Sequence, residues 1–359
     1  MRPERFFPER ILRLKAYRVP RADGLIKLDA MENPYGWPEA LKALWLERLM
    51  EVQPNRYPDP SAHLLKEALR EAEGIPPNLD LLLGNGSDEL IQLLMMVLVG
   101  SERGVLAPEP TFVMYRQIAE ALGVPFTSVP LRADFSLDLE RMVRTVEERR
   151  PKLLFLAYPN NPTGNLFDRQ AIEQLIETME GLVVVDEAYA PFTEATFLHD
   201  LERFPNLLLL RTLSKWGLAG IRLGYLVGRP EWIGPLDKLR LPYNIGVLNQ
   251  ITAHFALTEG KPVLDRQVAA IVRERRRLLK AMEAIPGVEP FRSEANFILF
   301  RVPDAPNVFE ALKRRGILIK NLHLPGGPLE NCLRVTVGRP EENEAFLTAL
   351  RQVLRESPF

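Results

Sequence analysis

Two residues of opposite charge follow two strongly apolar segments of the chain. Asp186 comes directly after residues 182–185, and Lys215 lies shortly after the apolar run 207–210. A lysine amine can form a Schiff base with an aldehyde cofactor, and a carboxylate can keep a pyridine nitrogen protonated so that the ring withdraws electrons. Lysine and aspartate together therefore indicate pyridoxal-phosphate chemistry.

Each of these two residues also has an ordinary explanation when it is taken alone. A lone lysine is most often a solvated charge, and an aspartate after a strand often caps a helix. The preceding segments, however, are typical of strands buried on both faces, with polar residues at their carboxyl ends. Open α/β sheets bind their ligands at those ends. The context therefore favours a site over two unrelated surface charges.

Two further loops could complete such a site. Gly86, Ser87 and Asp88 lie between a predicted strand and a predicted helix, where exposed backbone amides and a hydroxyl can hold a phosphate. A helix cap is the alternative interpretation. Asn161 lies in the run 158–164, which alone could be a turn of asparagine, proline and glycine.

Composition excludes several classes of protein. The chain has 359 residues, a formal net charge of −1 and one cysteine, Cys332, so no internal disulfide or cysteine metal cluster is possible. The near-neutral charge gives no general attraction to nucleic acid or to an anionic membrane. No secretory signal or membrane span is apparent, and the four histidines are dispersed, which indicates no metal site. We expect a cytoplasmic protein with small-molecule substrates.

The pattern of elements predicts an α/β fold with two domains. Apolar strands alternate with helices from about residue 60 to 250, which is typical of a mainly parallel sheet, and 224–228 is expected to be antiparallel. A long helix is expected over 262–285, followed by a small α+β region. We predict a large domain over 46–262, and a small domain made of 1–45 and 263–359.

Taken in order along the chain, several motifs resemble those of the fold-type I pyridoxal-phosphate aminotransferases. The resemblance covers about residues 26 to 345, and it is closest to the histidinol-phosphate aminotransferase family. It implies a large domain with a mainly parallel seven-stranded sheet and a small α+β domain. The segments that carry it are 32–36, 57–60, 110–112, 161–164, 186–189, 214–215, 220–222 and 333–338.

The resemblance also implies roles for individual residues. Lys215 would bind the cofactor and later carry a proton, Asp186 would pair with the pyridine nitrogen, and Tyr189 with Asn161 would contact the phenolic oxygen. Tyr115 would stack on the cofactor ring, although a core tyrosine is an equal alternative. Tyr57 would reach the phosphate of the neighbouring subunit, which implies an obligate homodimer with shared sites. The phosphate would be held by residues from several loops: Gly86, Ser87, Asp88, Thr212, Ser214 and Arg222.

The substrate side follows from the same resemblance. Arg334 would clamp the carboxylate of glutamate, and Tyr35 together with Asn33 would contact a substrate phosphate. Two positions depart from the family pattern, because Lys320 stands where arginine is common and Met31 where asparagine is common. The expected reaction is transamination between L-histidinol phosphate and 2-oxoglutarate in histidine biosynthesis. The alternatives are an aromatic or broad-specificity aminotransferase, a phosphothreonine decarboxylase-like enzyme and a non-catalytic regulator that senses the cofactor.

Overall fold

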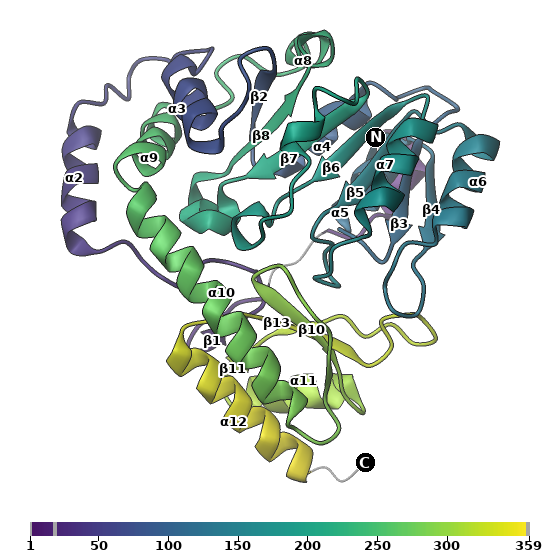
Figure 1. Ribbon diagram of the computed structural model, residues 1–359, viewed down its shortest axis with the longest axis vertical. Coiled ribbons are helices and arrows are strands. Elements are labelled where there is room, and N and C mark those ends of the chain that lie inside the picture. Colours follow the sequence, from purple (N-terminus) through teal and green to yellow (C-terminus); the bar gives the residue numbers. More distant parts are fainter. Residues whose placement is uncertain (1, 17–19, 357–359) are drawn as a thin grey trace.

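A seven-stranded mixed sheet forms the centre of the larger part of the molecule (Figure 1). The computed structural model describes residues 2–16 and 20–356. The strand order is β2-β8-β7-β6-β5-β3-β4, and β8 runs antiparallel to both of its neighbours. The antiparallel prediction for 224–228 is therefore confirmed. The strands are β2 (Asp80–Asn85), β3 (Val105–Glu109), β4 (Phe126–Pro130), β5 (Leu153–Ala157), β6 (Leu182–Asp186), β7 (Leu207–Thr212) and β8 (Leu223–Gly228).

Helices cover both faces of this sheet, as the apolar strands require. Successive side chains of a strand point to opposite faces, so Val183 and Val185 pack into one core while Leu182 and Val184 pack into another. The first face is covered by α3 (His63–Glu73), α6 (Leu139–Arg149), α7 (Arg169–Thr178) and α9 (Val247–Thr258). The second face is covered by α4 (Ser87–Met96), α5 (Met114–Leu122) and α8 (Pro230–Asp237).

A smaller α+β part lies below the large sheet in Figure 1, and the long helix α10 (Lys261–Glu283) joins the two. Its four-stranded sheet has the order β12-β13-β10-β9, and a two-stranded parallel pair joins β1 to β11. The bounds are β1 (Ile26–Lys27), β9 (Glu289–Pro290), β10 (Phe297–Arg301), α11 (Ala305–Arg314), β11 (Ile317–Leu318), β12 (Lys320–Asn321), β13 (Cys332–Thr336) and α12 (Pro340–Glu356). Strand β1, near the amino terminus, thus pairs with a strand of the carboxyl-terminal part.

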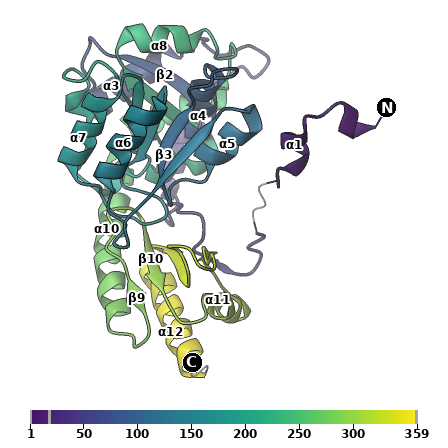
Figure 2. The ribbon, with the colours of Figure 1, turned by 90° about the vertical axis from the view of Figure 1, so that its right-hand side faces the viewer.

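The amino-terminal segment runs along the outside of the molecule (Figure 2). It contains η1 (Pro3–Arg5) and α1 (Glu9–Arg13), and Arg10 Nε donates a hydrogen bond to the carbonyl of Ala121 in α5 at 3.4 Å. The helix α2 (Glu39–Met50) follows and packs beside α9. Residues 1, 17–19 and 357–359 of the predicted small domain lie outside the described residues.

Some elements differ from the sequence predictions. The helix expected over 111–121 is α5, which begins three residues later at Met114. The edge strand β4 was not predicted, because its residues are mostly half-buried and do not form an apolar run. Within residues 2–16 and 20–356, no helix is long and apolar enough to cross a membrane. Short turns of helix complete the chain: η2 (Ala190–Phe192), η3 (Leu198–Asp200), η4 (Ser214–Leu218) and η5 (Ala219–Ile221).

Candidate active site

A cavity of about 90 Å³ lies at the carboxyl ends of β5, β6 and β7, beside the start of α4. This is the edge at which an open α/β sheet binds ligands. Segments from the amino terminus to β8 meet there, and most of the polar side chains predicted for the site are among them. The lining consists of Met31, Ser87, Asp88, Phe112, Ala157, Pro159, Asn161, Asp186, Ala188, Tyr189, Thr212, Ser214, Lys215 and Arg222.

Lys215 projects into this cavity from η4, the turn of helix that follows β7. Its Nζ lies 5.9 Å from the centre of the Tyr189 ring and donates a hydrogen bond to the carbonyl of Ala30 at 3.4 Å. Burial, and to a smaller extent the nearby Arg334 cation, lower the pKa of the Lys215 amine to about 8. An amine in this state is neutral, and hence nucleophilic, far more often than a solvated lysine.

Asp186 ends β6 and is buried, with only 4% of its surface exposed. Its Oδ1 accepts a hydrogen bond from the backbone amide of Ala188 at 3.1 Å, and its Oδ2 accepts one from the Tyr115 hydroxyl at 2.6 Å. Burial raises the pKa of Asp186 to about 6, although both hydrogen bonds act in the opposite direction. The protein therefore keeps a carboxylate in a position where its charge is costly unless a cation meets it.

This cost should appear in the pH dependence of stability of the ligand-free protein. The folded pKa of Asp186 lies above the unfolded value of 3.8. The neutral carboxyl group thus contributes stability that is complete below about pH 4 and is lost as the pH rises through about 6. We expect wild type to lose about 3 kcal/mol across this window relative to Asp186→Asn, since one pKa unit corresponds to about 1.4 kcal/mol. Urea unfolding of both proteins at a series of pH values measures this, and parallel pH profiles would contradict it.

Asn161 and Tyr189 form a pair on one wall of the cavity. Asn161 Nδ2 donates to the Tyr189 hydroxyl at 3.1 Å, while Asn161 Oδ1 accepts from Arg334 Nη1 at 2.6 Å. The neighbouring Asn160 does not line the cavity; its Nδ2 donates hydrogen bonds to the carbonyl of Pro110 and to Thr163 Oγ1. Asn160 therefore stabilises the loop, whereas Asn161 faces the cavity.

Arg334 belongs to β13, on the opposite side of the cavity from the large sheet. It shares a face of that strand with Cys332, whereas Leu333 and Val335 point into the small core. Its guanidinium also donates to the carbonyl of Asp29 at 3.1 Å and lies 5.1 Å from the centre of the Phe297 ring. A buried guanidinium is thereby presented toward Asn161 and the cavity.

The start of α4 and the turn after β7 bring together the donors predicted to hold an anion. Gly86 has a positive φ of 77°, and a Cβ there would lie 2.5 Å from Arg222 Nη2, so only glycine lets the arginine approach. Arg222 donates to Ser214 Oγ at 3.4 Å and to Asp88 Oδ2 at 3.3 Å. The Ser214 amide in turn donates to Thr212 Oγ1 at 3.1 Å. Hydroxyls, amides and one guanidinium thus converge beside a helix amino terminus.

Tyr115 occupies a different position from the one expected. Its ring is fully buried and stacks on Phe155, with ring centres 4.5 Å apart and planes at 11°, so it does not line the cavity. The residue that lines the cavity from this segment is Phe112, which packs edge-on against Tyr115. The motif Pro110-Thr111-Phe112 indicates this segment, and its own aromatic residue, Phe112, is the one at the cavity. The alternative of a core tyrosine is the one that the structure shows.

Asn33, Tyr35, Lys320 and Tyr57 do not line the cavity. Asn33 Nδ2 donates to the carbonyl of Trp216 at 3.0 Å, and Tyr35 packs against the small core. Lys320 of β12 lies opposite Arg334 in the strand register, which places two cations side by side. Tyr57 is 80% exposed and stacks on the ring of Tyr243, with centres 4.4 Å apart.

Met31 lines the cavity in an unusual backbone conformation that the sequence alone did not reveal. Its φ is 53°, in the left-handed region that asparagine adopts more readily than methionine. The Met31 amide donates to Thr336 Oγ1 at 3.0 Å, and its carbonyl accepts from Asn296 Nδ2 at 3.0 Å. These two bonds hold the strained residue in place.

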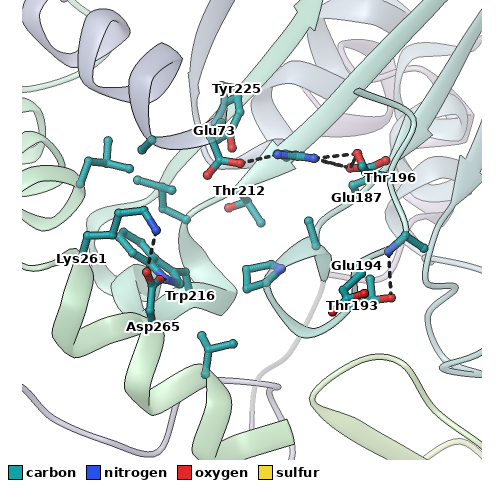
Figure 3. Close-up of a pocket in the computed structure, with 18 residues that line it drawn as sticks. Glu73, Glu187, Thr193, Glu194, Thr196, Thr212, Trp216, Tyr225, Lys261 and Asp265 are labelled. Atoms are coloured by element: carbon teal, nitrogen blue, oxygen red, sulfur yellow. Dashed lines mark hydrogen bonds and ion pairs between the residues drawn. The ribbon is translucent and has the colours of Figure 1, made fainter. Parts of the chain in front are cut away.

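A second, larger cavity of about 260 Å³ lies behind the first, on the face of the sheet covered by α3 and α9 (Figure 3). Arg211 crosses its wall and donates to Glu187 Oε2 from Nε at 3.0 Å and from Nη2 at 2.8 Å. Glu73 and Thr196 also contact the guanidinium. Glu187 follows Asp186 at the end of β6, and Arg211 precedes Thr212 at the end of β7. The Glu187–Arg211 ion pair therefore joins the two strand ends that form part of the first cavity. The part of the chain that the structure describes contains no group of three or more acidic, histidine or cysteine side chains able to hold a metal ion.

Comparison with known proteins agrees with this arrangement of lysine, aspartate and anion-binding groups. Residues 23–350 match the family described as aminotransferase class I and II. A histidinol-phosphate aminotransferase of Nitrosococcus oceani is 54% identical, covering 95% of each chain, and one of Ralstonia nicotianae is 50% identical, covering 96% of this chain and 93% of the other. This chain belongs to the class I and II aminotransferases. Within that family it groups with the histidinol-phosphate aminotransferases.

A solved structure shares the aminotransferase fold. The histidinol-phosphate aminotransferase of Sinorhizobium meliloti, determined in complex with pyridoxal 5′-phosphate, superposes with a TM-score of 0.86 at 23% identity and covers 98% of each chain. At this identity the likeness shows the fold, and it confirms the predicted seven-stranded sheet with a small additional domain.

Proposed function

We propose that this aminotransferase moves an amino group between L-histidinol phosphate and 2-oxoglutarate, giving imidazole-acetol phosphate and glutamate, as a step of histidine biosynthesis. One observation carries the proposal: a buried amine, a buried carboxylate and a cluster of anion donors line one cavity in a chain that is 54% identical to a histidinol-phosphate aminotransferase. The cofactor of the proposed reaction is pyridoxal 5′-phosphate.

The residues of the cavity fit this cofactor. When bound, pyridoxal phosphate supplies an electron sink that stabilises negative charge at the carbon next to the substrate nitrogen. Asp186, whose buried charge is costly in the ligand-free protein, would pair with the pyridinium nitrogen. Glycine at position 86 lets the Arg222 guanidinium approach the start of α4, where the phosphate group would lie. Ser87, Thr212, Ser214, Arg222 and the amide of Asp88 would hold that phosphate.

Lys215 would have two tasks in the reaction. Its amine would hold the cofactor through the aldehyde, and the same amine, once free, would move the proton of the substrate Cα. A pKa of about 8 suits both tasks, because the amine can gain and lose a proton near neutral pH. Asn161 and Tyr189 lie side by side on one wall of the cavity, joined by a hydrogen bond. Their polar groups would donate hydrogen bonds to the phenolic oxygen of the cofactor.

The two substrates would use different anionic contacts. Glutamate has a carboxylate beside the reacting carbon, and the guanidinium of Arg334, which contacts Asn161 in the ligand-free protein, would clamp that carboxylate. Histidinol phosphate has no carboxylate, but its distal phosphate would meet Lys320 beside Arg334, with Tyr35 and Asn33 nearby. Lysine offers a point charge rather than a planar fork, which is sufficient for a phosphate.

A homodimer with shared sites is part of the same proposal. Tyr57 is too exposed to serve the cavity of its own chain, and its ring is held by the stack on Tyr243. It would reach the cofactor phosphate of the neighbouring subunit. The predicted division into 46–262 and 1–45 with 263–359, and the cytoplasmic location, also stay proposals. Closure of the small domain over the cavity would exclude water from the reaction.

The decisive experiment is a spectroscopic titration of the purified protein reconstituted with pyridoxal phosphate. We expect L-histidinol phosphate to bleach the absorbance of the lysine-bound cofactor, and 2-oxoglutarate to restore it. Discharge by an aromatic amino acid but not by L-histidinol phosphate would replace the proposed substrate and keep the transamination. Release of carbon dioxide from phosphothreonine would support a decarboxylase instead. Absence of any cofactor band would contradict enzymatic activity, leaving a regulator or another role.

A further inference from the structure

The hydroxyl of Tyr115 donates a hydrogen bond to Asp186 Oδ2 at 2.6 Å, and both side chains are fully or almost fully buried. The contact joins α5 to the end of β6 on the second face of the sheet. A hydrogen bond to a carboxylate is among the stronger ones in proteins, and burial strengthens it further. It is therefore a feature that substitution of a single hydroxyl group can test.

The surroundings leave the Tyr115 hydroxyl little freedom to point elsewhere. The ring is stacked on Phe155 and meets Phe112 edge-on at 5.5 Å with planes at 85°. Phe112 itself forms part of the cavity wall. The phenol thus occupies a fixed slot behind the wall, and its only acceptor shown in the described residues is Asp186.

The carboxylate of Asp186 is consequently oriented by two donors. The amide of Ala188 contacts Oδ1 and the Tyr115 hydroxyl contacts Oδ2. Burial and the nearby acidic groups Asp88 and Glu187 disfavour its ionised form, whereas the two hydrogen bonds favour it. Of these two donors, Tyr115 is the side chain and Ala188 is a backbone amide.

We propose that Tyr115 is a positioning residue that holds Asp186 ionised and aimed into the cavity, so that the proton shared with the cofactor stays on the pyridine nitrogen. The proposal rests on the proposed pyridoxal-phosphate function. Tyr115 would not contact the cofactor itself. It would set how strongly the ring withdraws electrons, because a protonated ring nitrogen is a better electron sink than a neutral one.

Two properties of the phenol suit this role. It can donate a hydrogen bond to the carboxylate without losing its proton, since burial and the Asp186 charge raise the pKa of Tyr115 well above 10. Phenylalanine at this position would keep the stack on Phe155 and remove only the donor. The carboxylate of Asp186 would then lose one of its two hydrogen bonds, and the proton would shift from the ring nitrogen toward it.

The test compares wild type with Tyr115→Phe after reconstitution with pyridoxal phosphate labelled with nitrogen-15 in the ring. We expect the ring-nitrogen NMR signal of the resting variant to move from the pyridinium position toward that of neutral pyridine. We also expect kcat to fall by about ten- to a hundredfold with little change in KM, because a hydrogen bond to a charged group is lost. Tyr225→Phe is the matched control. Tyr225 is also buried, in β8 and near a charged side chain, but it lies in the second cavity.

Two outcomes would overturn the proposal. One is a ring-nitrogen signal that is unchanged in Tyr115→Phe, whatever happens to kcat, because a loss of activity alone would reflect a structural role. The other is an equal shift in Tyr225→Phe. The NMR measurement uses the enzyme without substrate, so its result does not depend on which amine is the substrate. Failure of wild type to bind the cofactor would instead count against the proposed function.

Discussion

Replacement of Lys215 by alanine is expected to lower kcat for the proposed transamination by at least about 10⁴-fold, the upper range for loss of a general base. The variant loses both the amine that attaches the cofactor and the group that moves the proton. Its fold should be retained, because the side chain lines a cavity and makes one long hydrogen bond, to the carbonyl of Ala30. Stopped-flow absorbance of each half-reaction gives the rates directly.

Two controls make the Lys215 result specific. Lys261→Ala removes a partly exposed lysine that forms an ion pair with Asp265 on α10, and it should leave both half-reactions close to wild type. Added methylamine should restore part of the lost rate in Lys215→Ala, because a small amine can enter the space left by the side chain and carry the proton. Activity of Lys215→Ala near the wild-type level, without added amine, would show that another group does this work.

Glu187→Ala should be the most destabilising of the substitutions considered. Glu187 is fully buried and pairs with the Arg211 guanidinium (Figure 3). It also accepts hydrogen bonds from the Thr196 hydroxyl and the amide of Phe197. Truncation leaves the Arg211 guanidinium buried with Glu73 as its remaining carboxylate partner. Breaking a buried ion pair by removal of one partner typically costs about 3–5 kcal/mol. We expect a loss of this size in the free energy of unfolding, measured by urea denaturation.

The control for Glu187→Ala is an ion pair of the same type at the surface. Glu140 and Arg144 are paired at 2.8 Å on α6, and both side chains are mostly exposed. Glu140→Ala should unfold at a urea concentration close to that of wild type, since exposed pairs contribute little. Equal unfolding midpoints for Glu187→Ala and wild type would mean that the pair across the second cavity does not stabilise the strand ends.

The centre of the fold and of the site could be predicted because burial leaves a strong signal in sequence. The segments that form β5, β6 and β7 each begin with at least four consecutive apolar residues, and polar residues lie at or soon after their carboxyl ends. These ends therefore mark the cavity. Lys215, Asp186, Asn161 and Ser214 all line it. Gly86 likewise has a positive φ and lies so close to the Arg222 guanidinium that a side chain at this position would collide with it.

Other features depend on three-dimensional contacts that leave no local pattern. Phe112 and Tyr115 are both aromatic residues at the start of one helix, and only packing decides that the first lines the cavity while the second lies behind it. The edge strand β4 has one neighbour, β3, and partly exposed residues, so its periodicity is weak. The strain at Met31 is a backbone property that follows from contacts with Thr336 and Asn296, far away in the sequence.

Side chains alternate between the two faces at the ends of β6 and β7, so neighbouring residues there have different roles: some line the candidate active site, and others form the ion pair that stabilises the strand ends. Asp186 lines the first cavity, Glu187 and Arg211 line the second, on the other side of the sheet, and Thr212 lies between them and lines both. An engineer who wishes to alter the substrate range can therefore vary the walls of the first cavity without touching the ion pair. Conversely, the second cavity offers room for substitutions that raise heat tolerance while the reacting groups stay in place.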